Sequence, residues 1–459
     1  MGKAHYMGKG LTEVRSPQRK LAPDIVGSDH RKPTSLRGIA DKAKADKKHR
    51  FQDLYRHLDA DLLVHCFYNL NKDAASGVDG VTWRTYEENL HENIGALVER
   101  LKSKRYRAKL VRRVLIPKGK GKRPLGIPVI EDKLLQAAAA KVLEAIYEQE
   151  FFPFSYAYRP GKGAKDAVRD LTFELQYGRY GYVVEIDIKG FFDHMDHNWL
   201  LTMLKLRIDD RAFLGLIRKW LKAGVLEIDG TVMHPDTGTP QGGVVSPVLA
   251  NVYLHYVVDL WFEKVVKTRC HGQALISRYS DDLVCAFQLR QEAERFYRSL
   301  PARLGKFTLE VAPEKTGILP FSRFDPTMKR RFTFLGFEFF WSKDRKGVPR
   351  VTRRTARTRL ISACRRIKEW IKENRHLPGK EFFRGLNVRL QGHYNYYGVY
   401  RNILSLYRYV KWVRICAFKW LNRRGGKKKS FTWEQFAAIL ESVMAKPRIT
   451  EVKHRKVYA

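Results

Sequence analysis

Two apolar, strand-like stretches of this 459-residue chain end or break at carboxylates. Asp187 closes the run "YVVEID", and Asp281 and Asp282 interrupt the run "ISRYSDDLVCAF" (276–287). A carboxylate in an apolar strand is costly unless it is paired or binds a cation. If the two strands are neighbours, the three carboxylates converge and supply the oxygen ligands that Mg²⁺ prefers, with Mn²⁺ as an alternative ion. Two such ions promote in-line phosphoryl displacement, so the sequence predicts nucleotidyl transfer or nuclease cleavage and does not decide between them.

The charge balance indicates which class of partner the chain binds. Lys and Arg number 87 against 48 Asp and Glu, which gives a formal net charge of +39. A folded chain with this excess repels itself unless it meets a polyanion, and nucleic acid is the obvious one. No apolar run approaches the ~20 residues of a membrane-spanning helix. The five cysteines are scattered without a Cys-x-x-Cys pair, which predicts reduced thiols in a cytoplasmic protein and no zinc finger.

The elements that must position the carboxylates are mixed. "KLVRRVLIPKGKGKRPLGIPV" (109–129) predicts a strand pair, and "EDKLLQAAAAKVLEAIYEQEF" predicts a helix with acidic residues in its first turn. Strands and helices follow no regular βα repeat, which favours an α+β fold over a doubly wound sheet. We therefore predict a flexible basic arm over 1–48, a mixed domain over 49–340 and a basic helical domain over 341–459.

The order of sequence blocks resembles the reverse transcriptase family, and specifically its group II intron-encoded reverse transcriptase/maturase members. The blocks that carry the resemblance are "SGVDGVT" (76–82), "KRPLGIPVIEDKLLQA" (122–137), "FSYAYRPGKGAKDAV" (154–168), "EIDIKGFFDHMDH" (185–197), "GTPQGGVVSPVLANVYL" (238–254), "RYSDDLV" (278–284), "LEVAPEKT" (309–316), "FTFLGFEF" (332–339) and the maturase-like "LNVRLQGHYNYYG" (386–398). One block alone is a weak motif, whereas the full ordered set is specific.

The resemblance implies a right-hand polymerase, with fingers and an antiparallel palm sheet over 49–340 and an α-helical thumb and maturase domain over 341–459. It implies an RNA-directed DNA polymerase of a group II intron that uses two Mg²⁺ ions and also binds intron RNA to assist splicing and mobility. Asp187 and Asp281 become the principal metal ligands. Asp282 lies beside them, pointing elsewhere because successive strand side chains alternate faces.

The resemblance also implies contacts to substrate. They are Phe192 under the incoming sugar, Gln241 and Gly242 beneath template and nucleotide, Lys122 and Arg123 at the triphosphate, Arg159 at template or triphosphate, and Tyr279 in the core or at the primer end. Phe191 is predicted to be a core residue. The implied partners are intron RNA or another RNA template, a DNA primer or target and deoxynucleoside triphosphates, with no membrane. The chain could be a monomer or a dimer. The expected location is the bacterial cytoplasm, in association with the nucleoid or with a ribonucleoprotein particle.

Three features depart from the family pattern. Ser280 stands where Ala is commoner, and both are small, so we expect polymerisation to survive. "LQGHYNYY" differs from the usual Arg-Gly-Trp version of the maturase segment, which leaves splicing competence open. No segment for a DNA endonuclease follows the maturase-like region, so we expect priming at a replication fork or an existing nick.

Two rival functions remain open. One is a splicing-only maturase that no longer polymerises, which the intact Asp187, Asp281 and Asp282 argue against. The other is a domesticated or defence-associated reverse transcriptase without an intron.

Overall fold

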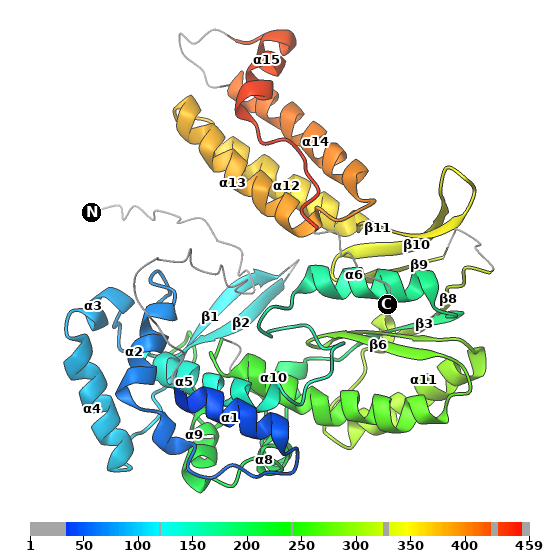
Figure 1. Ribbon diagram of the computed structural model, residues 1–459. Coiled ribbons are helices and arrows are strands. Elements are labelled where there is room, and N and C mark those ends of the chain that lie inside the picture. The colour runs from blue at the N-terminus through cyan, green and yellow to red at the C-terminus, as the bar shows by residue number, and fades with distance from the viewer. Residues whose placement is uncertain (1–33, 119–120, 240–241, 325–329, 424–429, 452–459) are drawn as a thin grey trace. The chain divides into compact units, whose positions relative to one another are not determined.

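Figure 1 shows the computed structural model, which describes residues 34–118, 121–239, 242–324, 330–423 and 430–451. The chain divides into two compact units. Unit 1 holds the described residues up to 153 together with 157–163 and 190–259, and unit 2 holds 154–156, 164–189 and the described residues from 260 onward. Each unit is therefore assembled from stretches that lie far apart in the sequence.

Unit 1 combines helices with one small sheet. Its α-helices are α1 (Thr34–Ala45), α2 (Ala60–Asn69), α3 (Trp83–Glu87), α4 (Leu90–Lys102), α5 (Ile130–Tyr147), α7 (Phe191–His194), α8 (His197–Lys205), α9 (Arg211–Leu221) and α10 (Ser246–Leu254). Its strands are β1 (Val111–Lys118), β2 (Gly121–Ile127), β4 (Val225–Leu226) and β5 (Val232–Met233), in the sheet order β2-β1-β4-β5. The predicted strand pair over 109–129 is confirmed as the antiparallel β1–β2 hairpin, and the predicted helix after it is confirmed as α5.

Part of the predicted flexible arm is helical. Residues 1–33 lie outside the described residues, but α1 occupies 34–45 of the stretch predicted to be flexible. Ile39 and Ala43, one turn apart, are buried, and α1 packs against α5. The prediction was wrong for α1 because two apolar side chains on one helix face suffice for docking, although the surrounding composition is polar and basic.

Unit 2 contains the carboxylate strands. Its strands are β3 (Tyr182–Asp187), β6 (Ala274–Tyr279), β7 (Asp282–Phe287), β8 (Gly317–Pro320), β9 (Arg331–Phe334), β10 (Phe337–Lys343) and β11 (Pro349–Thr355). Its α-helices are α6 (Ala164–Tyr177), α11 (Arg290–Gly305), α12 (Arg357–Asn374), α13 (Gly379–Tyr397), α14 (Ile403–Leu421) and α15 (Trp433–Val443). One sheet has the order β6-β7-β3-β8 with antiparallel pairs throughout, and a second has the order β11-β10-β9. The predicted neighbourhood of the two carboxylate strands is confirmed, because β3 pairs directly with β7.

The four-stranded sheet is covered on both faces. Val183, Val284 and Ala286 point into a core shared with α6, with the aromatic side chains of β9 and β10 and with Val351 of β11. The alternate residues of β7 face α11, where the rings of Phe287 and Phe296 lie 5.2 Å apart. Burial on both faces explains why β3 and β7 read as nearly continuous apolar runs, in which each carboxylate stands out.

The C-terminal helices of unit 2 pack on one another around their own core, and Figure 1 shows α12, α13 and α14 side by side. The Trp412 indole nitrogen on α14 donates to the Cys364 carbonyl on α12, 3.1 Å away. The predicted domain boundary between residues 340 and 341 falls inside β10, which continues its sheet to Lys343. Within the described ranges no helix is long and apolar enough to cross a membrane.

Candidate active site

The centre of the candidate site is a carboxylate pair on neighbouring strands. Asp187, the last residue of β3, lies directly opposite Asp282, the first residue of β7, in the antiparallel register. Residues directly opposite each other share one face of a sheet. Glu185, two residues before Asp187, shares that face and accepts a hydrogen bond from the Thr333 amide at 2.9 Å. The register therefore brings Asp187 and Asp282 together, whereas the predicted principal ligands were Asp187 and Asp281, with Asp282 beside them.

Asp281 lies at the hairpin tip between β6 and β7. Tyr279 pairs with Asp282, which leaves Ser280 and Asp281 as a two-residue loop. Ser280 has a φ of 59° and a buried side chain, so the position favours a small residue. That polymerisation survives with Ser280 in place of Ala stays a prediction.

A buried arginine fixes this hairpin. Arg278 on β6 is fully buried, and its guanidinium donates to Ser155 Oγ at 2.7 Å and to the Ser280 carbonyl at 3.4 Å. The backbone of residues 154–156 pairs with the same strand through hydrogen bonds between Arg278 and Phe154 and between Tyr156 and Arg278. The start of the block 154–168 thus supports the strand that leads into the Asp281–Asp282 hairpin.

The carboxylate cluster is electrostatically strained. Burial, together with the charges of Asp281 and Asp187, raises the pKa of Asp282 to about 7, although the Leu335 amide opposes the shift by donating to the carboxylate. Burial also raises the pKa of Glu185. Like charges held this close favour either a proton or a cation among them.

One cation of the protein already lies there. The Lys315 ammonium is 2.8 Å from Asp187 Oδ2, and the hydrogen bond to Asp187 and the charges of Asp187 and Asp281 raise the pKa of Lys315. The next residue, Thr316, accepts a hydrogen bond from the Asp187 amide at 3.3 Å through its hydroxyl. Sequence reasoning missed Lys315, and its only signal was membership of the block "LEVAPEKT".

The donor set fits a divalent cation. Among the described residues, no three His, Cys, Asp or Glu side chains are arranged as a ready-made metal site. Mg²⁺, however, is usually held by one or two carboxylates together with water and substrate phosphates. Asp187, Asp281 and Asp282 are carboxylates that repel one another, and the Lys315 ammonium occupies the position of a cation beside them. These three residues therefore suit a divalent ion held in this way.

Unit 1 holds the predicted sugar and base contacts. Phe191 is buried against Tyr253, whereas Phe192 is half-buried. The Phe192 carbonyl accepts from the Thr239 amide at 2.8 Å, which ties the residue to the start of the block 238–254. Gln241 lies outside the described residues. Gly242 follows with a φ of 121°, and a Cβ there would overlap the carbonyl oxygen of Gly126, so only glycine fits.

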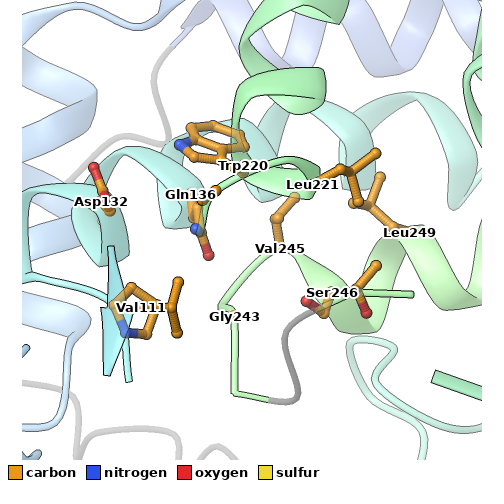
Figure 2. A pocket seen from close by; sticks show the side chains of 12 residues that line it. Val111, Asp132, Gln136, Trp220, Leu221, Gly243, Val245, Ser246 and Leu249 are labelled. Carbon is orange, nitrogen blue, oxygen red and sulfur yellow. The ribbon is translucent and has the colours of Figure 1, made fainter. Parts of the chain in front are cut away.

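A small pocket lies beneath that loop (Figure 2). Figure 2 shows Gln136 of α5 pointing toward the chain at Gly243, and its side-chain oxygen accepts from the Val244 amide at 2.8 Å. Buried Asp132, also in the lining, accepts from the Tyr106 hydroxyl and from the Lys109 amide. Gln136 thus holds the loop against α5, and Asp132 holds the segment before β1 against the same helix.

The predicted phosphate-binding cations differ in setting. Lys122 is exposed and Arg123 half-buried on β2. Arg159 has little exposure, and its guanidinium pairs with Glu148 at 3.0 Å and donates to the Phe152 carbonyl at 2.7 Å. These contacts favour a structural role for Arg159 over the predicted contact to template or triphosphate.

The predicted site residues divide between the units. Asp187, Asp281, Asp282 and Tyr279 belong to unit 2, where Tyr279 also packs against the core. Phe192, Gly242, Lys122, Arg123 and Arg159 belong to unit 1.

Comparison with known proteins gives consistent matches. The profile of the reverse transcriptase (RNA-dependent DNA polymerase) family matches residues 116–339. The group II intron-encoded protein LtrA of Lactococcus lactis subsp. cremoris is 38% identical over 229 residues, 49% of this chain and 38% of LtrA. Protein YkfC of Escherichia coli is 31% identical over 306 residues, 60% of this chain and 78% of YkfC. An uncharacterised 91 kDa protein in the cob intron of Schizosaccharomyces pombe is 36% identical over 207 residues, 44% of this chain and 25% of that protein. The matched region thus spans well under half the length of LtrA and of the S. pombe protein.

Proposed function

The chain belongs to the reverse transcriptase family, among proteins similar to those encoded by group II introns, and we propose that it is an RNA-directed DNA polymerase. The observation that carries the proposal is the pairing of Asp187 with Asp282 across β3 and β7, with Asp281 in the adjoining loop. Three carboxylates at one sheet end serve no evident purpose in a purely RNA-binding protein. They have an immediate purpose where phosphoryl transfer needs a divalent cation.

Asp187 and Asp281, with Asp282 beside them, would hold two Mg²⁺ ions. Mn²⁺ could take the place of Mg²⁺. When bound, the cation supplies Lewis-acid activation of the primer hydroxyl and neutralises charge on the phosphates. The chain's own groups do the rest. The Leu335 amide and the buried Arg278 hold the carboxylates and the hairpin tip in place, and Tyr279 supports the primer end.

Unit 1 supplies the substrate contacts in this proposal. Phe192 packs under the sugar of the incoming nucleotide, where an aromatic ring disfavours a 2′-hydroxyl. Gly242, with Gln241, lets the backbone approach template and nucleotide. Lys122 and Arg123 hold the triphosphate. Residues from 49 to the end of β11 at Thr355 then act as fingers and palm.

The helices from α12 onward act as thumb and maturase domain and bind duplex and intron RNA. The support is the exposed face of α14, where Arg408 and Lys411 accompany exposed Tyr407. Lysine and arginine supply the salt-dependent phosphate attraction, and aromatic rings stack on unpaired bases. Through this domain the protein assists splicing and mobility of its host intron.

Primer extension tests the polymerase assignment. Wild-type protein, Asp187→Asn, Asp281→Asn and the control Glu310→Gln are compared on an RNA template with a DNA primer, deoxynucleoside triphosphates and Mg²⁺. Glu310 is a surface carboxylate paired with Lys189, so it controls for loss of a nearby negative charge. We expect each Asp variant to lose at least about a hundred-fold in rate and the control to match wild type. Equal extension by all four proteins refutes the carboxylate assignment.

The two rival functions give different results. A splicing-only maturase would bind intron RNA without extending a primer. A domesticated or defence-associated enzyme would extend a primer, but the DNA flanking its reading frame would lack a group II intron. Inspecting that flanking DNA separates the last case from the first.

A further inference from the structure

A single residue of the β9–β10 turn contacts the candidate active site through its backbone. The turn consists of Leu335 and Gly336, both with positive φ, at 50° and 77°. The Leu335 amide donates a hydrogen bond to the carboxylate of Asp282. The position of this amide therefore helps to set the position of the carboxylate.

The other backbone group of Leu335 is held from the C-terminal helices. The Tyr396 hydroxyl, near the C-terminal end of α13, donates to the Leu335 carbonyl at 3.0 Å. The Tyr396 ring also stacks on Phe337, with ring centres 6.0 Å apart and planes at 14°. Tyr396, in the maturase-like segment 386–398, thus contacts the turn at two points, the Leu335 carbonyl and the Phe337 ring.

The turn needs such support. A left-handed conformation is unfavourable for a leucine and persists only where surrounding contacts impose it. Gly336 relieves the crowding at the next position, where a Cβ would approach the Tyr397 hydroxyl to 3.1 Å. Two adjacent tyrosines of α13 therefore lie against the two residues of the turn.

On the premise of the proposed polymerase function, we propose that Tyr396 is a positioning residue that seats the active-site carboxylate Asp282 through the Leu335 peptide groups. The chain of contacts runs from α13 to the Tyr396 hydroxyl, to Leu335, and to Asp282, all within unit 2. Ordering of Asp282 then depends on a helix outside the carboxylate sheet, so movement of the C-terminal end of α13 alters the catalytic centre.

The same helix offers a matched control. Tyr394 donates through its hydroxyl to the Ala445 carbonyl, also at 3.0 Å, but this partner belongs to the segment after α15. Tyr394→Phe and Tyr396→Phe each delete one hydroxyl-to-carbonyl bond from α13 and keep the ring. A purely structural role predicts the same result for both variants.

The experiment measures Mn²⁺ binding to the nucleic-acid-free protein by electron paramagnetic resonance, together with kcat, KM and Tm. We expect Tyr396→Phe to weaken Mn²⁺ binding and lower kcat by about ten-fold, the lower end for residues that orient metal ligands. Its KM for the primer–template should stay unchanged, and its Tm should fall no further than that of Tyr394→Phe. Tyr394→Phe should keep wild-type Mn²⁺ binding and kcat.

Matching kcat and Mn²⁺ affinities in the two variants would overturn the inference. So would a Tyr396→Phe defect confined to KM for the primer–template, since that would indicate nucleic-acid binding and not carboxylate seating. Wild-type protein without primer extension would instead count against the proposed function, so the two failures are distinguishable.

Discussion

The ammonium of Lys315 lies 2.8 Å from Oδ2 of Asp187, the residue that ends β3 opposite Asp282. Lys315 thus brings a positive charge, which strand pairing alone does not predict, to the place where the proposed metal ion is needed. An ammonium and a divalent cation compete for the same carboxylate oxygen.

Replacing Lys315 with Met should therefore tighten Mn²⁺ binding to the free protein. The pair is partly exposed, and such pairs contribute at most about 1 kcal/mol, so we expect an effect of about two- to five-fold. Calorimetric titration of the nucleic-acid-free protein measures it. Lys189→Met, which removes the exposed lysine paired with Glu310, is the control. Weaker Mn²⁺ binding in Lys315→Met would contradict the competition.

Gly242→Ala should weaken nucleotide binding by more than the cost of placing an alanine at positive φ. A Cβ at Gly242 overlaps the Gly126 carbonyl oxygen, whereas Gly230, also at positive φ, has open space around it. Both alanines incur the left-handed penalty of about 1–2 kcal/mol, but only Gly242→Ala must displace the loop. We expect its KM for deoxynucleoside triphosphates to rise about ten-fold. Equal KM values for Gly242→Ala and Gly230→Ala would count against a role of this loop in binding.

Asp132 should make the stability of unit 1 depend on pH. Burial raises its pKa from 3.8 to about 6. Because the folded-state pKa lies above the unfolded one, folding takes up a proton between these values, and the resulting stabilisation is complete below pH 3.8 and disappears as pH rises through 6. From pH 4.5 to 7.5 the free energy of unfolding should fall by about 2 kcal/mol from this group.

Denaturant unfolding across that pH range measures the slope. Asp132→Asn should remove this part of it, although the amide costs stability overall because Asp132 accepts from both Tyr106 and the Lys109 amide. Glu99→Gln, an exposed carboxylate of α4, should keep the wild-type slope. A slope unchanged in Asp132→Asn would show that the carboxyl group titrates normally.

Glu451→Gln should destabilise unit 2 by about 3–5 kcal/mol, the usual consequence of removing one partner of a buried ion pair. Glu451 lies 2.5 Å from Arg353 on β11, and both side chains are buried. Glu451 also accepts from the Tyr400 amide. Chemical denaturation of Glu451→Gln beside Glu441→Gln, an exposed carboxylate on α15, provides the comparison. A loss below about 1 kcal/mol would mean that the segment after α15 contributes little.

Local pattern was sufficient for the strands and the strongest helix. The runs ending at Asp187 and containing Asp281 became β3, β6 and β7, because apolar runs broken by single charges are typical of strands buried on both faces. The segment at 109–129 became a hairpin and the one after it α5. Helix α1 was missed because its two buried residues are a weak signal within a basic, polar stretch.

The amino-acid sequence by itself determined the family to which the chain belongs and predicted which carboxylates would carry its chemistry, since both depend on residue type and block order. Only the tertiary structure decided that Asp282 is the residue opposite Asp187 in the strand register. It also decided that Lys315 contacts Asp187 and that the Leu335 amide contacts Asp282. Tyr396 joins the same chain of contacts through Leu335, 61 residues away in sequence. Hydrophobic periodicity reports only neighbours within a turn or a strand, so contacts between such distant segments exist only once the chain has folded.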